Sequence, residues 1–494
     1  MNLASQSNMG KHCPSRLVVP WALLSGSRSV AEYNANNAWY YNGNNGCVNN
    51  NNKYNSNGAR VVRDYLVVKV EDVENCMIPL SRWYSVYWLC RQRKASKPSH
   101  LAFYYGMPMN LIDLTISIKN MEYIPEQGIC FIITYPRIRE VIAADFIDRL
   151  VQTWFCKNLM PYLERFFLHK DSYACREGKG TLAAVRQVQE YIFDLSWGFT
   201  RDVWLAKLDI QSFFTSIDTE LSAERLIGFI QEHIKDEGIK NLLIYLTRII
   251  YQSLPQMHCV LKSPDWLYNM VPERKRMRGK VTKYGVAIGN QTSQMIACFM
   301  TTYVLRFIEG LGYVFVHYTD DTCIIITDKG KWLIDRVRIK EFLEQDSHLT
   351  QHPDKIYLQH YSKGVEFLGM KIRFDRVLPS DRIVHNFRWK VEMHIRKGTN
   401  SNKYLYREAE HFSQIINSYM GLFKWCNAYR LRKEILTQIA ESCWGKIYVV
   451  SENYTKVNVI YGATRRGLFM RKNKVRKKAR TAMLNEFYSK LEAA

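Results

Sequence analysis

Two adjacent aspartates, Asp320 and Asp321, interrupt a run of residues that otherwise favours β-structure. Valine, isoleucine, tyrosine and phenylalanine surround them in the segment 314–326, and a short polar break between two such runs predicts a hairpin. Adjacent carboxylates repel each other unless a cation neutralises them, and carboxylate oxygens are preferred ligands of Mg²⁺. The segment therefore predicts a turn that presents acidic groups for metal-assisted phosphate chemistry.

A third aspartate, Asp209, ends another β-rich segment, Trp204 to Ile210. Phosphoryl transfer with two metal ions about 3.5–4 Å apart needs carboxylates that converge from at least two backbone elements. Asp209 and Asp320 meet this need if their strands are neighbours. One ion would then activate the attacking hydroxyl, and the other would hold a triphosphate. Taken alone, Asp209 is better explained as the cap of a helix or turn, and its combination with the hairpin favours the metal site.

Two further segments carry residues suited to a nucleotide. The loop 285–294 leads into an apolar helix, and its Gly289 permits a close approach of the backbone to a base or sugar. Polar side chains that include Gln294 follow in the same loop. Arg137 and Arg139 lie on one side of a predicted extended segment, where they could grip a triphosphate, although a solvated edge strand explains them equally well.

The chain is basic, with a net charge of +23 and a pI near 9.4. Since 47% of its 494 residues are apolar, a sizeable core can form and global disorder is excluded. The charge indicates a polyanionic partner, the alternative being a soluble protein that is merely basic. Much of the excess lies in one C-terminal cluster, which predicts salt-sensitive binding to phosphate backbones. It comprises Arg465, Arg466, Arg471, Lys472, Lys474, Arg476, Lys477, Lys478 and Arg480.

The cysteines argue against extracellular or zinc-ribbon architectures. All 12 are dispersed and no C-x-x-C pair occurs, which fits a reducing cytosol in which cysteines serve as small core residues. The apolar run 17–24 is too short to span a bilayer and contains a proline, so we expect a cytoplasmic protein with no membrane association. Residues 33–60 are rich in asparagine, which favours turns, in either a disordered linker or a docked surface segment.

Helical and strand patterns alternate irregularly along the rest of the chain. Apolar spacing predicts helices over 146–155, 222–252 and 295–308, and β-formers predict a strand over 203–210. Beyond residue 375 the pattern is basic and mainly helical. This irregular mixture predicts an α+β protein.

Together, these segments resemble the reverse transcriptases of bacteria. Tyr318–Asp321 resembles that family's Y-x-D-D box, residues 207–214 resemble its first aspartate block, and residues 285–294 resemble its template–nucleotide loop. Further blocks occur in the same order upstream and downstream, at 123–125, 136–149, 171–181, 352–359 and 365–371. The resemblance covers about residues 80–430.

The resemblance implies a right-hand polymerase with a ferredoxin-like (RRM-like) palm, fingers and a helical thumb. The expected divisions are an N-terminal extension with the Asn-rich segment over 1–75, fingers over 76–205, a palm over 206–372 and a basic helical thumb with a C-terminal tail over 373–494. A finger insertion is expected at about 220–280.

The resemblance also implies roles for individual residues. Asp209 and Asp320 would ligate two Mg²⁺ ions directly, with Asp321 a weaker ligand and Mn²⁺ an alternative ion. Phe214 matches the aromatic gate that excludes a ribose 2′-hydroxyl, which makes deoxynucleotides the substrates, although core packing explains a phenylalanine as well. Lys355 matches a proton donor to pyrophosphate, or it is a solvated surface lysine. The nucleotide-binding set is Arg137, Arg139, Ile210, Phe214, Gly289, Gln294 and Lys355.

Gln294 stands where retroviral, group II intron and retron enzymes usually carry a proline. A glutamine at this position of the loop resembles the loop of diversity-generating retroelement enzymes and of related defence-associated enzymes. Residues 416–425 resemble their thumb, and the Asn-rich stretch resembles translated adenine-rich repeats of the former. The segment 146–152 lacks the basic residue and histidine pair of the nearest relatives, and both terminal regions exceed the minimal mutagenic enzyme.

These features favour an antiphage enzyme that makes DNA from a structured noncoding RNA, with an accessory protein or a second copy of the chain as further partners. Mutagenic retrohoming is the alternative. A nucleic-acid-binding scaffold without catalysis is a third hypothesis, against which the intact carboxylates argue.

Overall fold

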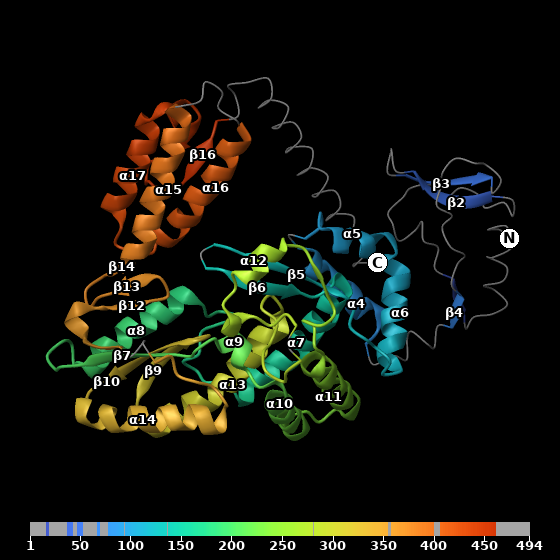
Figure 1. Cartoon of the computed structure of the whole chain (residues 1–494), viewed down its shortest axis with the longest axis horizontal. Coiled ribbons are helices and arrows are strands. Elements are labelled where there is room, and N and C mark those ends of the chain that lie inside the picture. The colour runs from blue at the N-terminus through green and yellow to red at the C-terminus, as the bar shows by residue number, and fades with distance from the viewer. Residues whose placement is uncertain are drawn as a thin grey trace. The chain divides into compact units, whose positions relative to one another are not determined.

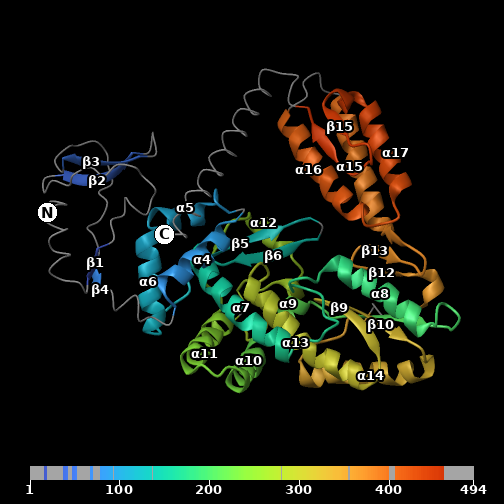
Figure 2. The ribbon, with the colours of Figure 1, turned by 180° about the vertical axis from the view of Figure 1, so that it is seen from behind.

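The computed structural model describes residues 78–460 except 93, 136, 280, 354–356 and 400–405, together with four short strands nearer the N-terminus. The chain divides into two compact units, which Figure 1 and Figure 2 show from opposite sides. The first unit comprises Met1–Cys175, Ile210–Phe307 and Val337–Gln351. The second unit comprises Arg176–Asp209, Ile308–Arg336 and His352–Ala494.

The first unit is mainly helical. Its helices are α4 (Leu80–Arg91), α5 (Pro98–Tyr105), α6 (Met107–Lys119), α7 (Phe146–Phe166), α9 (Phe213–Ser216), α10 (Thr219–His233), α11 (Glu237–Gln252) and α12 (Asp265–Asn269), with a 3-10 turn η1 (Glu273–Lys275). Most of α13 (Gln291–Gly310) and the second half of α14 (Lys329–Asp346) also belong to this unit. Trp83 of α4 and Trp154 of α7 are both buried and lie with ring centroids 6.3 Å apart, so aromatic packing joins the two helices. The helix predicted from residue 146 is confirmed.

A three-stranded sheet completes this unit. Strand β5 (Gly128–Ile133) pairs antiparallel with β6 (Arg139–Ala143) and parallel with β8 (Cys259–Leu261). The buried carboxylate of Glu140 accepts hydrogen bonds from the backbone N–H groups of Met277 and Arg278, at 3.0 and 2.9 Å. These bonds hold the segment that leads to the nucleotide loop against the sheet.

The helical prediction over 222–252 is confirmed, but the chain forms two helices there rather than one. Helix α10 ends at His233, and Ile234 is extended. Asp236 then caps α11, with its side chain accepting from the Ile239 N–H at 2.8 Å. An aspartate in that position satisfies an orphan N–H and starts a new helix, which apolar periodicity alone does not reveal.

The second unit contains a four-stranded antiparallel sheet in the order β11-β7-β10-β9. Its strands are β7 (Trp204–Asp209), β9 (Val314–Tyr318), β10 (Asp321–Ile326) and β11 (Tyr357–His360). Helix α13 (Gln291–Gly310) precedes β9 in the chain, and α14 (Lys329–Asp346) follows β10. This is the βαββαβ connectivity of a ferredoxin-like palm, as predicted. Helix α8 (Thr181–Leu195) contacts β9 and β10.

The second unit continues into a helical region, as predicted from residue 375 onward. A small sheet comes first, with β12 (Val365–Phe367), β13 (Met370–Ile372) and β14 (Val377–Pro379). Helices α15 (Asp381–Thr399), α16 (Tyr406–Phe423) and α17 (Tyr429–Glu441) lie alongside one another in both ribbon views. Two 3-10 turns and one hairpin, none of which had been predicted, complete the second unit. The turns are η2 (Tyr361–Lys363) and η3 (Cys443–Lys446), and the hairpin consists of β15 (Tyr448–Val450) and β16 (Val457–Val459).

Near the N-terminus, β1 (Arg16–Val18) pairs with β4 (Val67–Lys69). The Asn-rich stretch contains a second ladder, in which β2 (Asn37–Asn42) pairs antiparallel with β3 (Cys47–Asn52). The composition favoured turns over regular elements here, and the structure instead places Trp39, Tyr40 and Tyr41 within a strand. Aromatic side chains favour strands, and this preference outweighs the turn tendency of asparagine.

The cysteines that the structure describes are free thiols, and most of them are buried. This agrees with their predicted role as core residues. Within the described part of the chain, no helix combines the length and the hydropathy needed to cross a bilayer.

The buried Asp148 of α7 makes stability depend on pH. Its Oδ1 accepts from the Tyr123 hydroxyl at 2.6 Å and from the Glu126 N–H at 3.1 Å, yet burial dominates and raises the pKa of this carboxyl to about 6. The folded state therefore binds the proton more tightly than the unfolded state. The unfolding free energy of the protein therefore falls as the pH rises from about 4 to above 6.

We predict that Asp148→Asn, which keeps the accepting oxygen, stabilises the protein at pH 8 by up to about 3 kcal/mol and has little effect at pH 4. Denaturant titrations of both proteins at the two pH values measure this. Asp265→Asn, at an exposed carboxylate, is the control and should leave the pH dependence unchanged. Parallel stability curves for wild type and Asp148→Asn would contradict the prediction.

Candidate active site

The acidic pair lies where predicted, at the tip of a hairpin in the second unit. Tyr318 pairs with Asp321 across β9 and β10, which leaves Thr319 and Asp320 as a two-residue turn. Thr319 has φ 60°, in the left-handed region that two-residue hairpins require and that a β-branched residue rarely adopts. This backbone conformation costs about 1–3 kcal/mol, which the hydrogen bonds and packing of the surrounding sheet offset.

Asp209 joins the pair through the strand register. As the last residue of β7, it lies directly opposite Asp321 in the antiparallel ladder. Residues directly opposite each other share one face of a sheet, with Cβ atoms about 4.5–5.5 Å apart. The carbonyl of Asp209 also accepts from the His352 N–H at 2.8 Å, which fixes the strand end. The prediction that the two acidic strands are neighbours is therefore confirmed.

The sheet behind the carboxylates is rigid and apolar. Residues 322–326 of β10 are all buried, and the Thr322 hydroxyl lies 2.9 Å from His317 Nδ1 across the hairpin. The partly exposed carboxylates thus project from the edge of a closed core. Because the ladder hydrogen bonds fix β7 and β10 relative to each other, the two strands cannot shift register to move Asp209 away from Asp321.

The donor set suits a hard divalent cation. Asp209, Asp320 and Asp321 offer only carboxylate oxygens, which Mg²⁺ prefers. Among the described residues, no three histidine, cysteine, aspartate or glutamate side chains already surround a common point. Like charges directly opposite in a ladder repel, so a bound cation would be needed to hold these three side chains in a convergent arrangement.

The predicted nucleotide-binding residues other than Lys355 lie in the first unit. Ile210 is 5% exposed, so its backbone rather than its side chain is available to a ligand. Phe213 is buried at 3% exposure, whereas Phe214 is half-buried. The Phe214 carbonyl accepts from the Val286 N–H at 2.8 Å, which links this phenylalanine to the nucleotide loop.

The nucleotide loop packs tightly against β6. Gly289 has φ 116°, and a Cβ built there would lie 3.1 Å from Val141 Cγ1, so glycine is required both by conformation and by space. Asn290 Oδ1 accepts from the Ala144 N–H at 3.3 Å. Gln294 follows in the first turn of α13, is exposed, and contacts Cys175, which lies in the block 171–181 but had been given no role of its own.

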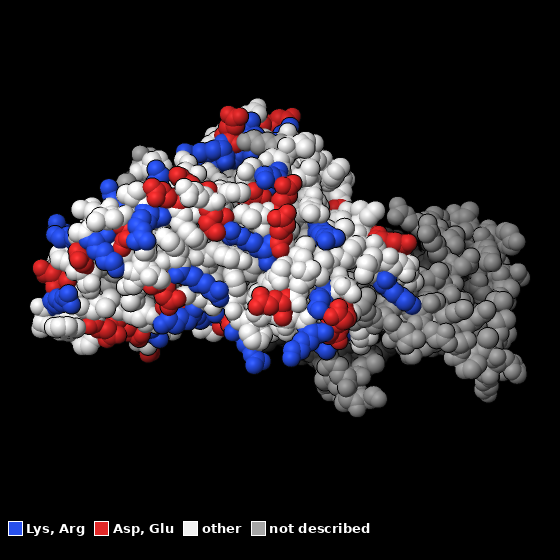
Figure 3. All heavy atoms as spheres, turned by 90° about the horizontal axis from the view of Figure 1, so that it is seen from below, with Lys and Arg blue, Asp and Glu red and all other residues white. Residues whose placement is uncertain are grey.

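Arg137 and Arg139 are both exposed, at the start of β6. Lys355 and the C-terminal basic cluster lie outside the described residues. On the face drawn in Figure 3, lysine and arginine alternate with aspartate and glutamate, without one continuous basic surface. The strand register brings the three aspartates to one sheet edge of the second unit, and the two arginines belong to the first unit.

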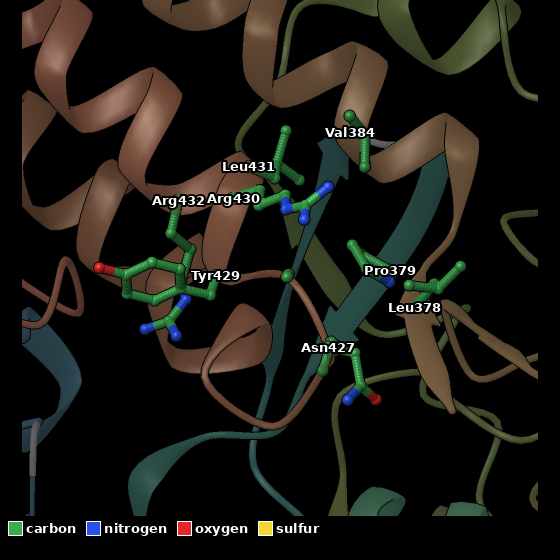
Figure 4. Close-up of a pocket in the computed structure, with 10 residues that line it drawn as sticks. Leu378, Pro379, Val384, Asn427, Tyr429, Arg430, Leu431 and Arg432 are labelled. Carbon is green, nitrogen blue, oxygen red and sulfur yellow. The ribbon is translucent and has the colours of Figure 1, made fainter. Parts of the chain in front are cut away.

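Each unit also contains a cavity that the sequence did not indicate. In the first unit, a cavity of about 670 Å³ adjoins the nucleotide loop and is lined by Asp148 and Asn290, among others. In the second, a cavity of about 640 Å³ lies between β14 and the start of α17, where Figure 4 shows Arg430 near Val384. Asn427 borders this cavity and exchanges two hydrogen bonds with Val377, at 2.7 and 3.0 Å.

The topology and the three carboxylates define a palm-type polymerase site. Residues 136–372 match the family model described as reverse transcriptase (RNA-dependent DNA polymerase). Residues 136–372 therefore form a reverse transcriptase domain. All three aspartates fall within the matched segment.

Similar solved structures include telomerases of two yeasts, and no curated protein matches the chain. A Candida tropicalis telomerase truncated from its C-terminal domain aligns with 12% identity and a TM-score of 0.39 over 51% of this chain and 55% of that one. A Candida albicans telomerase with a fragment of telomeric RNA aligns with 10% identity and a TM-score of 0.36 over 64% and 62%. The chain thus spans less than two thirds of either telomerase.

We predict that Asp209→Asn and Asp320→Asn each reduce primer extension about 10³-fold or more, because loss of one metal ligand removes several kcal/mol of charge stabilisation. Both variants should remain folded, since neutralising one carboxylate relieves repulsion. Mg²⁺ should raise the melting temperature of the wild type and much less that of the variants. Asp375→Asn, an exposed turn carboxylate of the same unit, is the control and should behave as wild type. Full activity in either site variant would contradict the assignment.

Proposed function

We propose that this protein copies RNA into DNA from deoxynucleoside triphosphates, with two Mg²⁺ ions held by Asp209, Asp320 and Asp321. The observation that carries the proposal is the ladder register that sets Asp209 opposite Asp321, within the segment that matches the reverse transcriptase model. Carboxylates from two strands at one sheet edge are the arrangement that two-ion nucleotidyl transfer requires.

When bound, the ions would polarise the reacting phosphate and increase the acidity of the primer hydroxyl. The chain's own residues would do the rest. Arg137 and Arg139 would neutralise the triphosphate, and the close approach permitted at Gly289 would seat the sugar and base. The ring of Phe214 would fill the space of a 2′-hydroxyl. Lys355 would donate a proton to pyrophosphate.

Primer extension on a defined RNA template tests this function. Purified protein with Mg²⁺ should incorporate deoxynucleotides, and Mn²⁺ should substitute for Mg²⁺. Absence of any extension on RNA, together with full function of Asp320→Asn in cells, would instead support the catalytically silent scaffold.

We predict that Phe214→Val raises ribonucleotide incorporation relative to deoxynucleotides by about 10- to 200-fold, the range expected when a side chain no longer excludes one small group. Competition assays with both nucleotides give the ratio of kcat/KM values. Phe213→Leu, at the buried neighbour, is the matched control and should leave this ratio unchanged. An unchanged ratio of kcat/KM values in Phe214→Val would show that Phe214 does not exclude ribonucleotides.

For the biological role, we propose antiphage defence in the bacterial cytoplasm, with DNA made from a structured noncoding RNA. The glutamine at position 294 and the basic C-terminal cluster support this proposal. The cluster would hold the RNA, assisted by an accessory protein or a second copy of the chain. Mutagenic retrohoming is the alternative, favoured by the same glutamine and by the Asn-rich stretch.

Sequencing the DNA made in cells distinguishes these roles. We expect products that copy one noncoding RNA or contain simple repeats, appearing on phage infection. Copies of a genomic repeat with substitutions at adenines would support retrohoming and overturn the defence role.

A further inference from the structure

Cys175 contacts the glutamine that the nucleotide loop presents. Its Sγ lies 3.4 Å from Gln294 Oε1, with the thiol as donor and the amide oxygen as acceptor. Both side chains are exposed, so burial does not force the contact. Both residues belong to the first unit.

The backbone around Cys175 is held in an unusual conformation. Cys175 has φ 57°, in the left-handed region that residues with a Cβ seldom adopt. The preceding Ala174 is fully buried, and its carbonyl accepts from Cys298 Sγ at 3.6 Å. Cys298 lies one turn after Gln294 on α13, so one helix face anchors the Ala174–Cys175 segment and also carries the residue that Cys175 contacts.

We propose that Cys175 is a positioning residue that orients the carboxamide of Gln294 for nucleotide binding. With Oε1 occupied by the thiol, the Nε2 amide is the group left to donate to a nucleotide. This inference rests on the proposed function, because it assigns Gln294 the nucleotide contact. An unrestrained glutamine would present either end of its amide and would lose side-chain entropy on binding.

The protonation state of Cys175 supplies an independent readout. The neighbouring Cys298 thiol lowers the pKa of the Cys175 thiol to about 7, against a smaller opposing effect of burial. Cys298 is the titratable group that contacts it from α13, and Asp171, Arg176 and Glu177 are the charged residues nearest in its own segment. A thiolate cannot donate to Oε1, so the restraint on Gln294 weakens as pH rises through about 7.

The test is steady-state primer extension by the full chain with Cys175→Ala and Cys175→Ser. We expect Cys175→Ala to raise KM for the deoxynucleotide about 3- to 10-fold, the factor for one lost hydrogen bond, with kcat changed less than about twofold. Cys175→Ser keeps a donor and should restore KM. The wild-type KM should rise between pH 6.5 and 8, whereas KM of Cys175→Ser should not.

A double-mutant cycle with Gln294→Ala separates positioning from a general structural effect. In the Gln294→Ala background, Cys175→Ala should have no further effect on KM. Cys90→Ala removes a thiol from helix α4 of the same unit and should leave KM unchanged. Additive effects of Cys175→Ala and Gln294→Ala, or an unchanged KM in active Cys175→Ala, would overturn this inference alone. An inactive wild type would instead overturn the proposed function.

Discussion

The antiparallel register between β7 and β10 is the constraint on which the active site depends. It places Asp209 opposite Asp321 at the sheet edge. Because side chains alternate between the two faces of a strand, a slip of one residue would send one carboxylate into the core. Residues 322–326 are buried on both faces of β10, and the close packing of their side chains holds the strand in the observed register. Core packing thus determines the position of the charges.

The hairpin tip combines strain with charge repulsion. Thr319 adopts a left-handed conformation, and three carboxylates share one sheet edge. Neither feature stabilises the isolated fold, so the ladder and the packing of α8 on β9 and β10 must offset both. A divalent cation reverses the sign of the electrostatic contribution. The part of the sheet that is least favourable by itself is therefore the part suited to bind metal and triphosphate.

Much of the fold could be predicted from local patterns. The β-forming residue types predicted the strands at 203–210 and 314–326, and apolar spacing predicted the helices that begin near 146 and 295. The helical prediction over 222–252 missed only the break between α10 and α11, where Asp236 caps the second helix. The β15–β16 hairpin was missed because its strands have three residues each, too few for a periodic pattern.

The sequence by itself determined the chemistry of this protein, because an acidic pair between β-formers and a lone aspartate at a strand end are local features. Only the tertiary structure decided which residues act together. The pairing of Asp209 with Asp321 joins positions more than 100 residues apart, and the contact of Cys175 with Gln294 spans 119. Such contacts arise from sheet register and helix packing, which depend on the whole core rather than on neighbouring residues.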